Sequence, residues 1–149
     1  MELEKEIQQT SFSSIYHKMA LNILFTAHWM EYHNACFLKS WGITPQQFNI
    51  LRILRGQHPK PASVNLLIER MLDKMSNASR LVEKLRVKGL VSRQECLDDR
   101  RQVDVLITGE GLALLKEIDA TMDEQQKFSD MLTESEAVEL NRLLEKLRG

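Results

Sequence analysis

The sequence is poor in the residues that mark secreted, disordered or all-β proteins. It has only two cysteines, three prolines and six glycines among 149 residues. Two cysteines are too few for a disulfide framework, and so few helix-breaking residues exclude a collagen-like or disordered chain. No apolar run reaches the roughly 18 residues that a membrane-spanning helix needs. The first residues, MELEKEIQQT, lack the basic and apolar regions of a signal peptide, so we expect a cytoplasmic protein.

The net charge of −1 conceals an uneven distribution of charge along the chain. Residues 1–40 carry three basic and four acidic side chains, and residues 109–149 carry five and ten. Residues 41–108 between them carry twelve basic and seven acidic side chains, a net charge of +5. A basic middle segment between acidic ends indicates a module that binds a polyanion.

Long helices are predicted on both sides of this basic segment. Residues 10–38 contain no glycine or proline, and their apolar residues recur every three or four positions from Phe12 to Phe37. Such a helix would be about 40 Å long and would pack either over its own domain or against another chain. Thr108 is expected to cap a helix that reaches about residue 130, and a capping box at Thr133 starts the last helix.

The pattern of residues 44–107 predicts three short helices followed by a β-hairpin. Thr44 caps the first helix and Ser63 the second, while the third runs from Ser76 to Lys88. Residues 90–95 can form a strand, and residues 102–107 alternate between apolar and polar side chains; the two segments flank a polar turn and predict the hairpin. This order defines a winged helix-turn-helix, so the expected fold class is mainly α with a small β-hairpin wing. The residues expected to face its core from the three helices are Phe48, Ile50, Leu51, Leu54, Leu67, Ile68, Met71, Ala78, Leu81, Val82 and Leu85.

Polar and basic side chains of the third helix form the candidate DNA-contact surface. Ser76, Asn77 and Arg80 lie at its N-terminus, from which amide, hydroxyl and guanidinium groups can reach base edges in a major groove. The alternative is an ordinary solvent-exposed helix face. The residues predicted around this centre, mainly for contacts to phosphates, are Ser63, Lys74, Ser79 and Lys84.

The turn of the hairpin adds a second candidate contact. Arg100 and Arg101 are adjacent in it, and a narrow minor groove concentrates negative potential that attracts such side chains. Asp99 can hold one guanidinium in a fixed direction through a bidentate ion pair. Because this turn follows a helix-turn-helix directly, a DNA-binding wing is favoured over a solvated turn.

These segments resemble the MarR family of bacterial transcription regulators. The resemblance is carried by SNASRLVEKL at residues 76–85, KGLV at 88–91, Asp99-Arg100-Arg101, and Leu106-Ile107-Thr108 with Gly111. It implies a homodimer that binds a pseudo-palindromic operator in double-stranded DNA, usually as a repressor. The terminal segments 1–40 and 109–149 would interleave as a helical dimerisation region, and 41–108 would be the winged DNA-binding domain. The family's wing pattern implies that Arg101 enters the minor groove, that Asp99 orients it and that Arg100 contacts the backbone.

The resemblance also implies release from DNA by a small aromatic or anionic effector bound between the dimer helices and the DNA-binding lobe. Ordinary core and interface packing is the alternative for the aromatic and histidine side chains in that region. The candidate residues for this site are Phe25, His28, Trp29, Tyr32, His33, Trp41 and Phe48.

Other kinds of site are not predicted. Cys36 and Cys96 are expected to be structural or incidental thiols, and the spacing of the histidines does not favour a metal site. No catalytic motif is present, so we expect neither a cofactor nor an enzymatic activity. The competing hypothesis is a winged-helix module that binds proteins and has no role on DNA.

Overall fold

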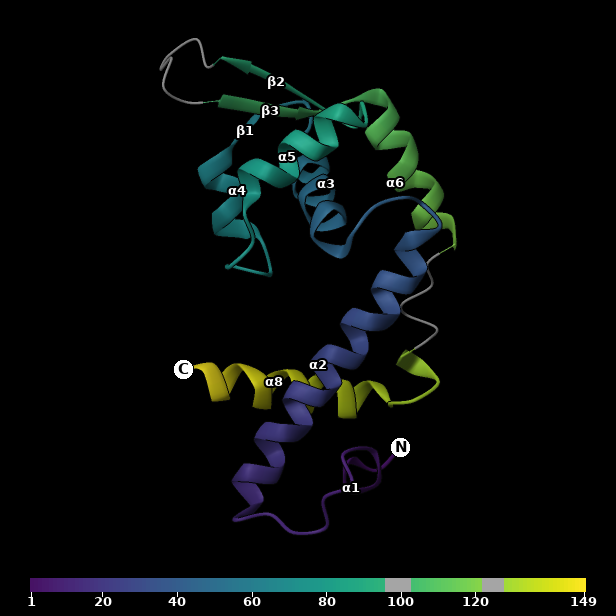
Figure 1. The fold of residues 1–149 in the computed structure, drawn as a ribbon, viewed down its shortest axis with the longest axis vertical. Coiled ribbons are helices and arrows are strands. Elements are labelled where there is room, and N and C mark those ends of the chain that lie inside the picture. Colours follow the sequence, from purple (N-terminus) through teal and green to yellow (C-terminus); the bar gives the residue numbers. More distant parts are fainter. Residues whose placement is uncertain (96–102, 122–127) are drawn as a thin grey trace. The chain divides into compact units, whose positions relative to one another are not determined.

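A computed structural model of the protein describes residues 1–95, 103–121 and 128–149. These residues form two compact units, 1–112 and 113–149, and Figure 1 labels their helices and strands. The fold is mainly helical with one three-stranded antiparallel sheet, which confirms the expected fold class. In the ranges that the structure describes, no helix is both long and apolar enough to cross a membrane.

The first unit begins with a short helix, α1 (Leu3–Glu6), and a long one, α2 (Ile15–Lys39). α2 starts five residues later than the sequence pattern predicted, because Ser14 is its N-cap and accepts a hydrogen bond from the backbone N–H of His17 at 3.1 Å. Phe12 therefore lies before the helix. Leu38 is the only residue of α2 that is buried.

Three short helices and a sheet follow in the predicted order. The helices are α3 (Pro45–Gln57), α4 (Val64–Arg70) and α5 (Ala78–Val87). At the start of α3, Thr44 and Gln47 form the predicted capping box: each backbone N–H donates to the other side chain, at 3.1 and 3.2 Å. Ser63 caps α4 as predicted, accepting from the backbone N–H of Leu66 at 3.1 Å.

The sheet contains one strand that the sequence pattern did not predict. Its order is β1 (Ala62–Ser63), β3 (Val103–Ile107), β2 (Val91–Glu95). β2 and β3 form the expected antiparallel hairpin, with Val91 opposite Ile107 and Glu95 opposite Val103. β1 adds Ala62 opposite Val105 on the other edge of β3. A strand of two residues is too short to show a periodicity in the sequence.

The predicted core of this lobe is confirmed except at Ile68, which is exposed, and Leu81, which is half-buried. Ile50, Leu51, Leu67 and Leu85 are fully buried, and most of the other predicted core side chains are also buried. Ile68 is 41% exposed, so its assignment to the core was wrong. Leu67 marks the buried face of α4, and Met71, the C-cap that follows the helix, is also buried, whereas Ile68 is rotated about 100° away from Leu67.

Two glycines shape the junction between α5, the hairpin and the next helix, α6 (Gly109–Thr121). Gly89 has φ +74° and ends α5 as predicted, while Leu90 N–H donates to the carbonyl of Leu85 at 3.0 Å. Thr108 caps α6, as predicted, through its Oγ1, which accepts from the backbone N–H of Gly111 at 3.1 Å. A Cβ atom on Gly111 would stand 2.4 Å from the carbonyl oxygen of Leu90, so this position requires glycine.

The second unit contains most of α6 and the C-terminal helix α8 (Glu134–Arg148). In α6, Leu115 and Ile118 are fully buried. The predicted continuation of α6 to about residue 130 falls partly on residues 122–127, which lie outside the described residues. The capping box at Thr133 is confirmed, with Glu136 as its partner, and no residue of α8 is buried.

Candidate nucleic-acid interface

The N-terminus of α5 is the centre of the candidate interface, and it begins two residues later than predicted. Asn77 is the N-cap, and its Oδ1 accepts from the backbone N–H of Arg80 at 3.0 Å. Ser76 precedes the helix, and its hydroxyl donates to Oδ2 of Asp73 at 2.6 Å. The amide NH₂ of Asn77 is a separate donor from its capping oxygen, so capping leaves that donor available for a base edge.

Asp73 organises the turn that leads into α5. Its Oδ1 accepts from the backbone N–H of Met75 at 2.9 Å, while Oδ2 accepts from the Ser76 hydroxyl. These hydrogen bonds, with the Ser76 hydroxyl first, hold the pKa of the Asp73 carboxyl below its usual value. The predicted turn before α5 is therefore a defined structure that is held by one carboxylate.

Some of the other side chains predicted to contact DNA are exposed and free of ion pairs to described residues, whereas others form hydrogen bonds within the lobe. Ser79, Arg80 and Lys84 are exposed on α5, and neither Arg80 nor Lys84 forms an ion pair with any residue that the structure describes. Lys74 is exposed but donates through Nζ to carbonyl oxygens at the end of α4. Ser63 is half-buried, and its hydroxyl caps α4.

An ion-pair cluster that the sequence analysis missed joins α5 to the wing. Glu83 accepts from Arg86 on the same helix, with Nη2 at 2.8 Å from Oε1, and from Nη1 of Arg93 on β2 at 3.2 Å. The hydrogen bond from Arg86 is the main cause that lowers the pKa of Glu83 from 4.5 to about 2. Desolvation opposes this shift, and Arg93 lowers the pKa further by a smaller amount. The Glu83–Arg86 spacing of three residues was the available signal, but the pairing to Arg93 depends on how β2 packs against α5.

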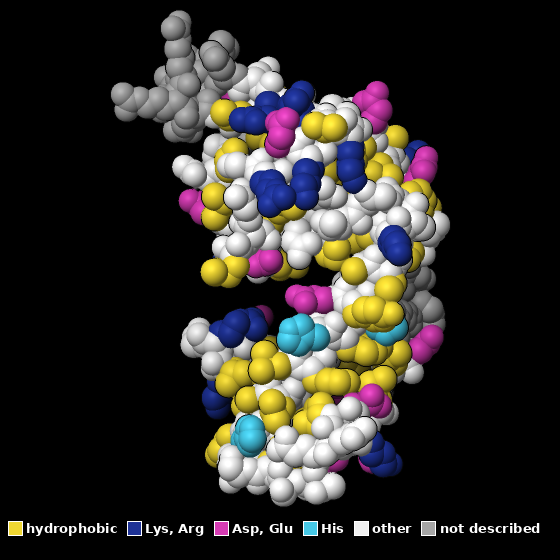
Figure 2. Space-filling model, in the orientation of Figure 1, with side chains coloured by type: hydrophobic (Ala, Val, Ile, Leu, Met, Phe, Trp, Pro, Cys, Tyr) yellow, Lys and Arg dark blue, Asp and Glu magenta, His cyan; other side chains and the backbone are white. Residues whose placement is uncertain are grey.

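Basic side chains gather on the face of the lobe that carries α5 and the strands (Figure 2). Glu83 is the acidic member of the cluster on α5 and β2, and its two arginine partners leave that cluster with a net positive charge. A phosphate backbone attracts such a surface at long range, and backbone contacts then position the protein.

The predicted wing contacts belong to the turn between β2 and β3. Asp99, Arg100 and Arg101 lie outside the described residues, as does Cys96. The strands that carry the turn are described up to Glu95 and from Val103 onward, and their antiparallel pairing is the hairpin that the prediction requires.

The candidate effector residues fall into separate groups. Trp29, Tyr32 and His33 form an aromatic cluster on α2, with the His33 ring 4.6 Å from Trp29 and 5.7 Å from Tyr32, both edge-on. Phe48 is 8% exposed in the core of the lobe, with the Arg52 guanidinium 5.7 Å from its ring. The remaining candidates are the half-buried Phe25 and Trp41 and the exposed His28.

A hollow elsewhere in the first unit is lined by other residues. It has a volume of about 840 Å³ and lies beside α1, with Glu4 and Lys18 among its lining side chains. None of the candidate effector residues lines it. Among the described side chains, no three from histidine, cysteine, aspartate and glutamate are grouped as a metal site would require.

The helices α3 to α5 and their three-stranded sheet define a winged helix-turn-helix protein. Residues 41–102 match the model of the MarR family, and the structure is similar to solved MarR-family transcription regulators. No protein with a curated description matches the sequence.

Solved structures of MarR-family proteins share the fold over nearly the whole chain. The MarR transcription factor of Planctomyces limnophilus is 29% identical, with a TM-score of 0.68 and coverage of 91% of this chain and 98% of its own. MepR of Staphylococcus aureus, in complex with DNA, is 22% identical with a TM-score of 0.76, covering 92% and 96%. BpsR of Bordetella bronchiseptica, whose DNA binding is regulated by 6-hydroxynicotinic acid, is 22% identical with a TM-score of 0.70, covering 88% and 99%.

Proposed function

We propose that this protein is a transcriptional repressor that binds a pseudo-palindromic operator as a homodimer. The observation that carries the proposal is the N-terminus of α5, where Asn77 and the exposed Arg80 follow a turn fixed by Asp73. In a helix-turn-helix, this end of the second helix enters the major groove. MepR, with the same fold, has been solved on DNA, which supports this use of the lobe.

The two proposed domains have different roles. The DNA-binding domain is formed by residues 41–108, which carry a net charge of +5. The dimerisation region, which joins it to a second chain, is formed by residues 1–40 and 109–149. Ser63, Lys74, Ser79 and Lys84 contact or border the phosphate backbone around the centre of the interface. Arg101, oriented by Asp99, enters the minor groove, and Arg100 contacts a phosphate.

Exposed apolar side chains on the terminal helices support the homodimer. On α2, Ile15 is 77%, Tyr16 is 74% and Leu24 is 56% exposed. On α8, Val138 is 63% and Leu147 is 54% exposed. Large apolar side chains left exposed along a helix are typical of a protein–protein interface, and interleaving of the terminal helices of two chains would cover them.

An aromatic or anionic effector is the proposed signal. The Trp29–His33–Tyr32 cluster offers ring edges and faces together with an imidazole, which suit an aromatic acid or phenol. The regulation of BpsR by an aromatic acid supports this choice of ligand class. Phe25, His28, Trp41 and Phe48 are the other residues that we propose for contact with the effector.

Selection of bound sequences from a random pool of DNA duplexes tests the proposed function. We expect enrichment of an inverted repeat whose half-sites are about 10 bp apart, one helical turn. Arg80→Ala should weaken binding to the recovered duplex, and Arg142→Ala on α8 is the control because Arg142 is paired with Glu139 outside the lobe. A pool that shows no enrichment at low salt would favour the competing hypothesis, a protein-binding module.

A further inference from the structure

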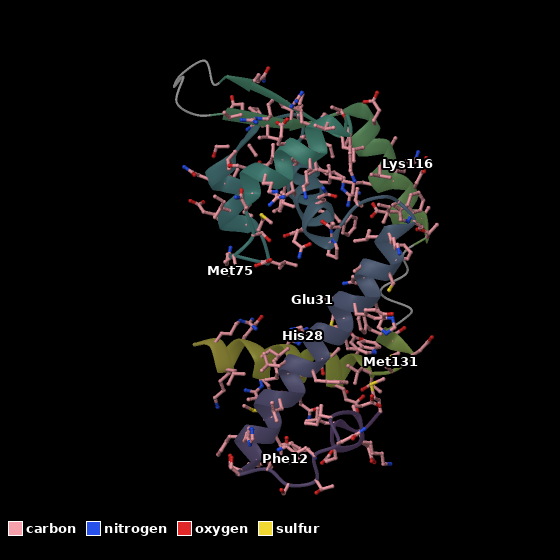
Figure 3. The ribbon with its side chains drawn as sticks, viewed as in Figure 1. Phe12, His28, Glu31, Met75, Lys116 and Met131 are labelled. Carbon is pink, nitrogen blue, oxygen red and sulfur yellow. The ribbon has the colours of Figure 1, made fainter. Side chains whose placement is uncertain are left out.

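The turn between α4 and α5 carries two apolar side chains that are almost completely exposed. Met75 is 93% and Leu72 is 89% exposed, more than any other large apolar side chain that the structure describes. Met75 lies at the tip of this turn, away from the core of the lobe (Figure 3). It directly precedes Ser76 and Asn77, at the end of α5 that would face DNA.

Polar contacts hold this turn in one conformation although its apolar side chains are exposed. Oδ1 of Asn49 on α3 accepts from the backbone N–H of Leu72 at 2.9 Å. Asp73 accepts from the backbone N–H of Met75 at 2.9 Å, and Lys74 donates to the last carbonyls of α4. A side chain presented on a fixed backbone loses less conformational freedom on binding.

We propose that Met75 contacts the 5-methyl group of a thymine in the major groove and so contributes to the base specificity of the operator. The inference rests on the proposed function. Among the groups that base pairs present in the major groove, the thymine methyl is the apolar one. An unbranched thioether adapts well to such a target. Two side chains offer far less area than the roughly 1,000 Å² of a specific protein interface, so a methyl group fits this surface better than a protein does.

Replacement of thymine by deoxyuridine tests the inference because it removes the 5-methyl group alone. The duplex recovered by selection is prepared with each thymine replaced in turn, and binding is measured by fluorescence anisotropy. In the wild-type protein, we expect one replacement in each half-site to weaken binding about fourfold, the effect of losing one buried methyl group.

Three variants assign the effect to a side chain. Met75→Ala should bind the thymine and deoxyuridine duplexes equally at the sensitive position, whereas Met75→Leu should retain most of the difference. Leu72→Ala removes an equally exposed apolar side chain from the same turn and should leave the difference unchanged. Circular dichroism should show that all three variants fold, because neither side chain is packed.

The outcomes separate this inference from the proposed function. If the wild-type protein binds the duplex but no thymine is sensitive, or if Met75→Ala keeps the wild-type sensitivity, the inference is wrong and the proposed function stands. Loss of the difference in Leu72→Ala would also overturn the assignment to Met75. Failure of the wild-type protein to bind any duplex would remove the proposed function and the inference together.

Discussion

Gly111 is the position where the smallest possible side chain should be most harmful. A Cβ atom there would lie 2.4 Å from the carbonyl oxygen of Leu90 and 2.7 Å from Cγ1 of Ile107. Neither atom can move freely, because the Leu90 carbonyl accepts from the backbone N–H of Thr108 at 3.1 Å and Ile107 is buried. Gly111→Ala must therefore separate the start of α6 from the junction between α5 and the hairpin.

The expected loss of stability follows from three contributions. Overpacking of a tight site costs about 1–3 kcal/mol, and weakening the Thr108–Leu90 hydrogen bond costs about 1 kcal/mol more. The higher helix propensity of alanine offsets about 1 kcal/mol of this loss of stability. The free energy of unfolding should thus fall by about 1–3 kcal/mol.

Urea unfolding followed by circular dichroism, at one protein concentration for all variants, measures this change. Gly56→Ala in α3 and Gly109→Ala in α6 are matched controls, because a Cβ at either position meets nothing within 4 Å. Both should be as stable as the wild-type protein or up to about 1 kcal/mol more stable. If Gly111→Ala were as stable as these controls, the close contact with Leu90 would not exist.

Three further predictions concern electrostatics, DNA contact and assembly. Because the pKa of Glu83 is lowered in the folded protein, its ion pairs stabilise the fold fully at pH values above 4.5, and this stabilisation should disappear as the pH falls towards 2. The free energy of unfolding of Glu83→Gln, measured in urea, should lack this part of the pH dependence. Arg101→Ala should weaken operator binding by about 1–3 kcal/mol in anisotropy titrations, and unchanged affinity would remove the wing from the interface. Light scattering at micromolar concentration should give twice the chain mass of 17.3 kDa, and Leu143→Glu on α8 should shift it towards one chain mass.

Local signals in the sequence were sufficient for most of the winged helix-turn-helix. The capping residues Thr44, Ser63 and Thr133 act as predicted, because a cap is a contact between residues three apart. The turn to β2 was predictable at Gly89, because its φ of +74° suits glycine. Core positions on the helices followed from spacing alone, except where Ile68 adjoined the buried face of α4.

Contacts between separate elements could not be predicted in the same way. The pairing of Glu83 with Arg93 and the contact of Gly111 with Leu90 both depend on how α5, the hairpin and α6 pack together. At the candidate interface, the residue types around Ser76 correctly indicated the start of a helix, but they did not indicate which residue is its N-cap. Ser76 and Asn77 are both good capping residues, and the competition was decided by Asp73, which binds Ser76 and leaves Asn77 to cap α5.

The mass of the complex with the selected duplex, measured by native mass spectrometry, shows directly whether two lobes of one dimer hold the same double helix. We expect one duplex with two chains of 17.3 kDa, and no species with a single chain when the duplex is in excess. A complex with one chain per duplex, or free duplex at every protein concentration, would contradict the proposal.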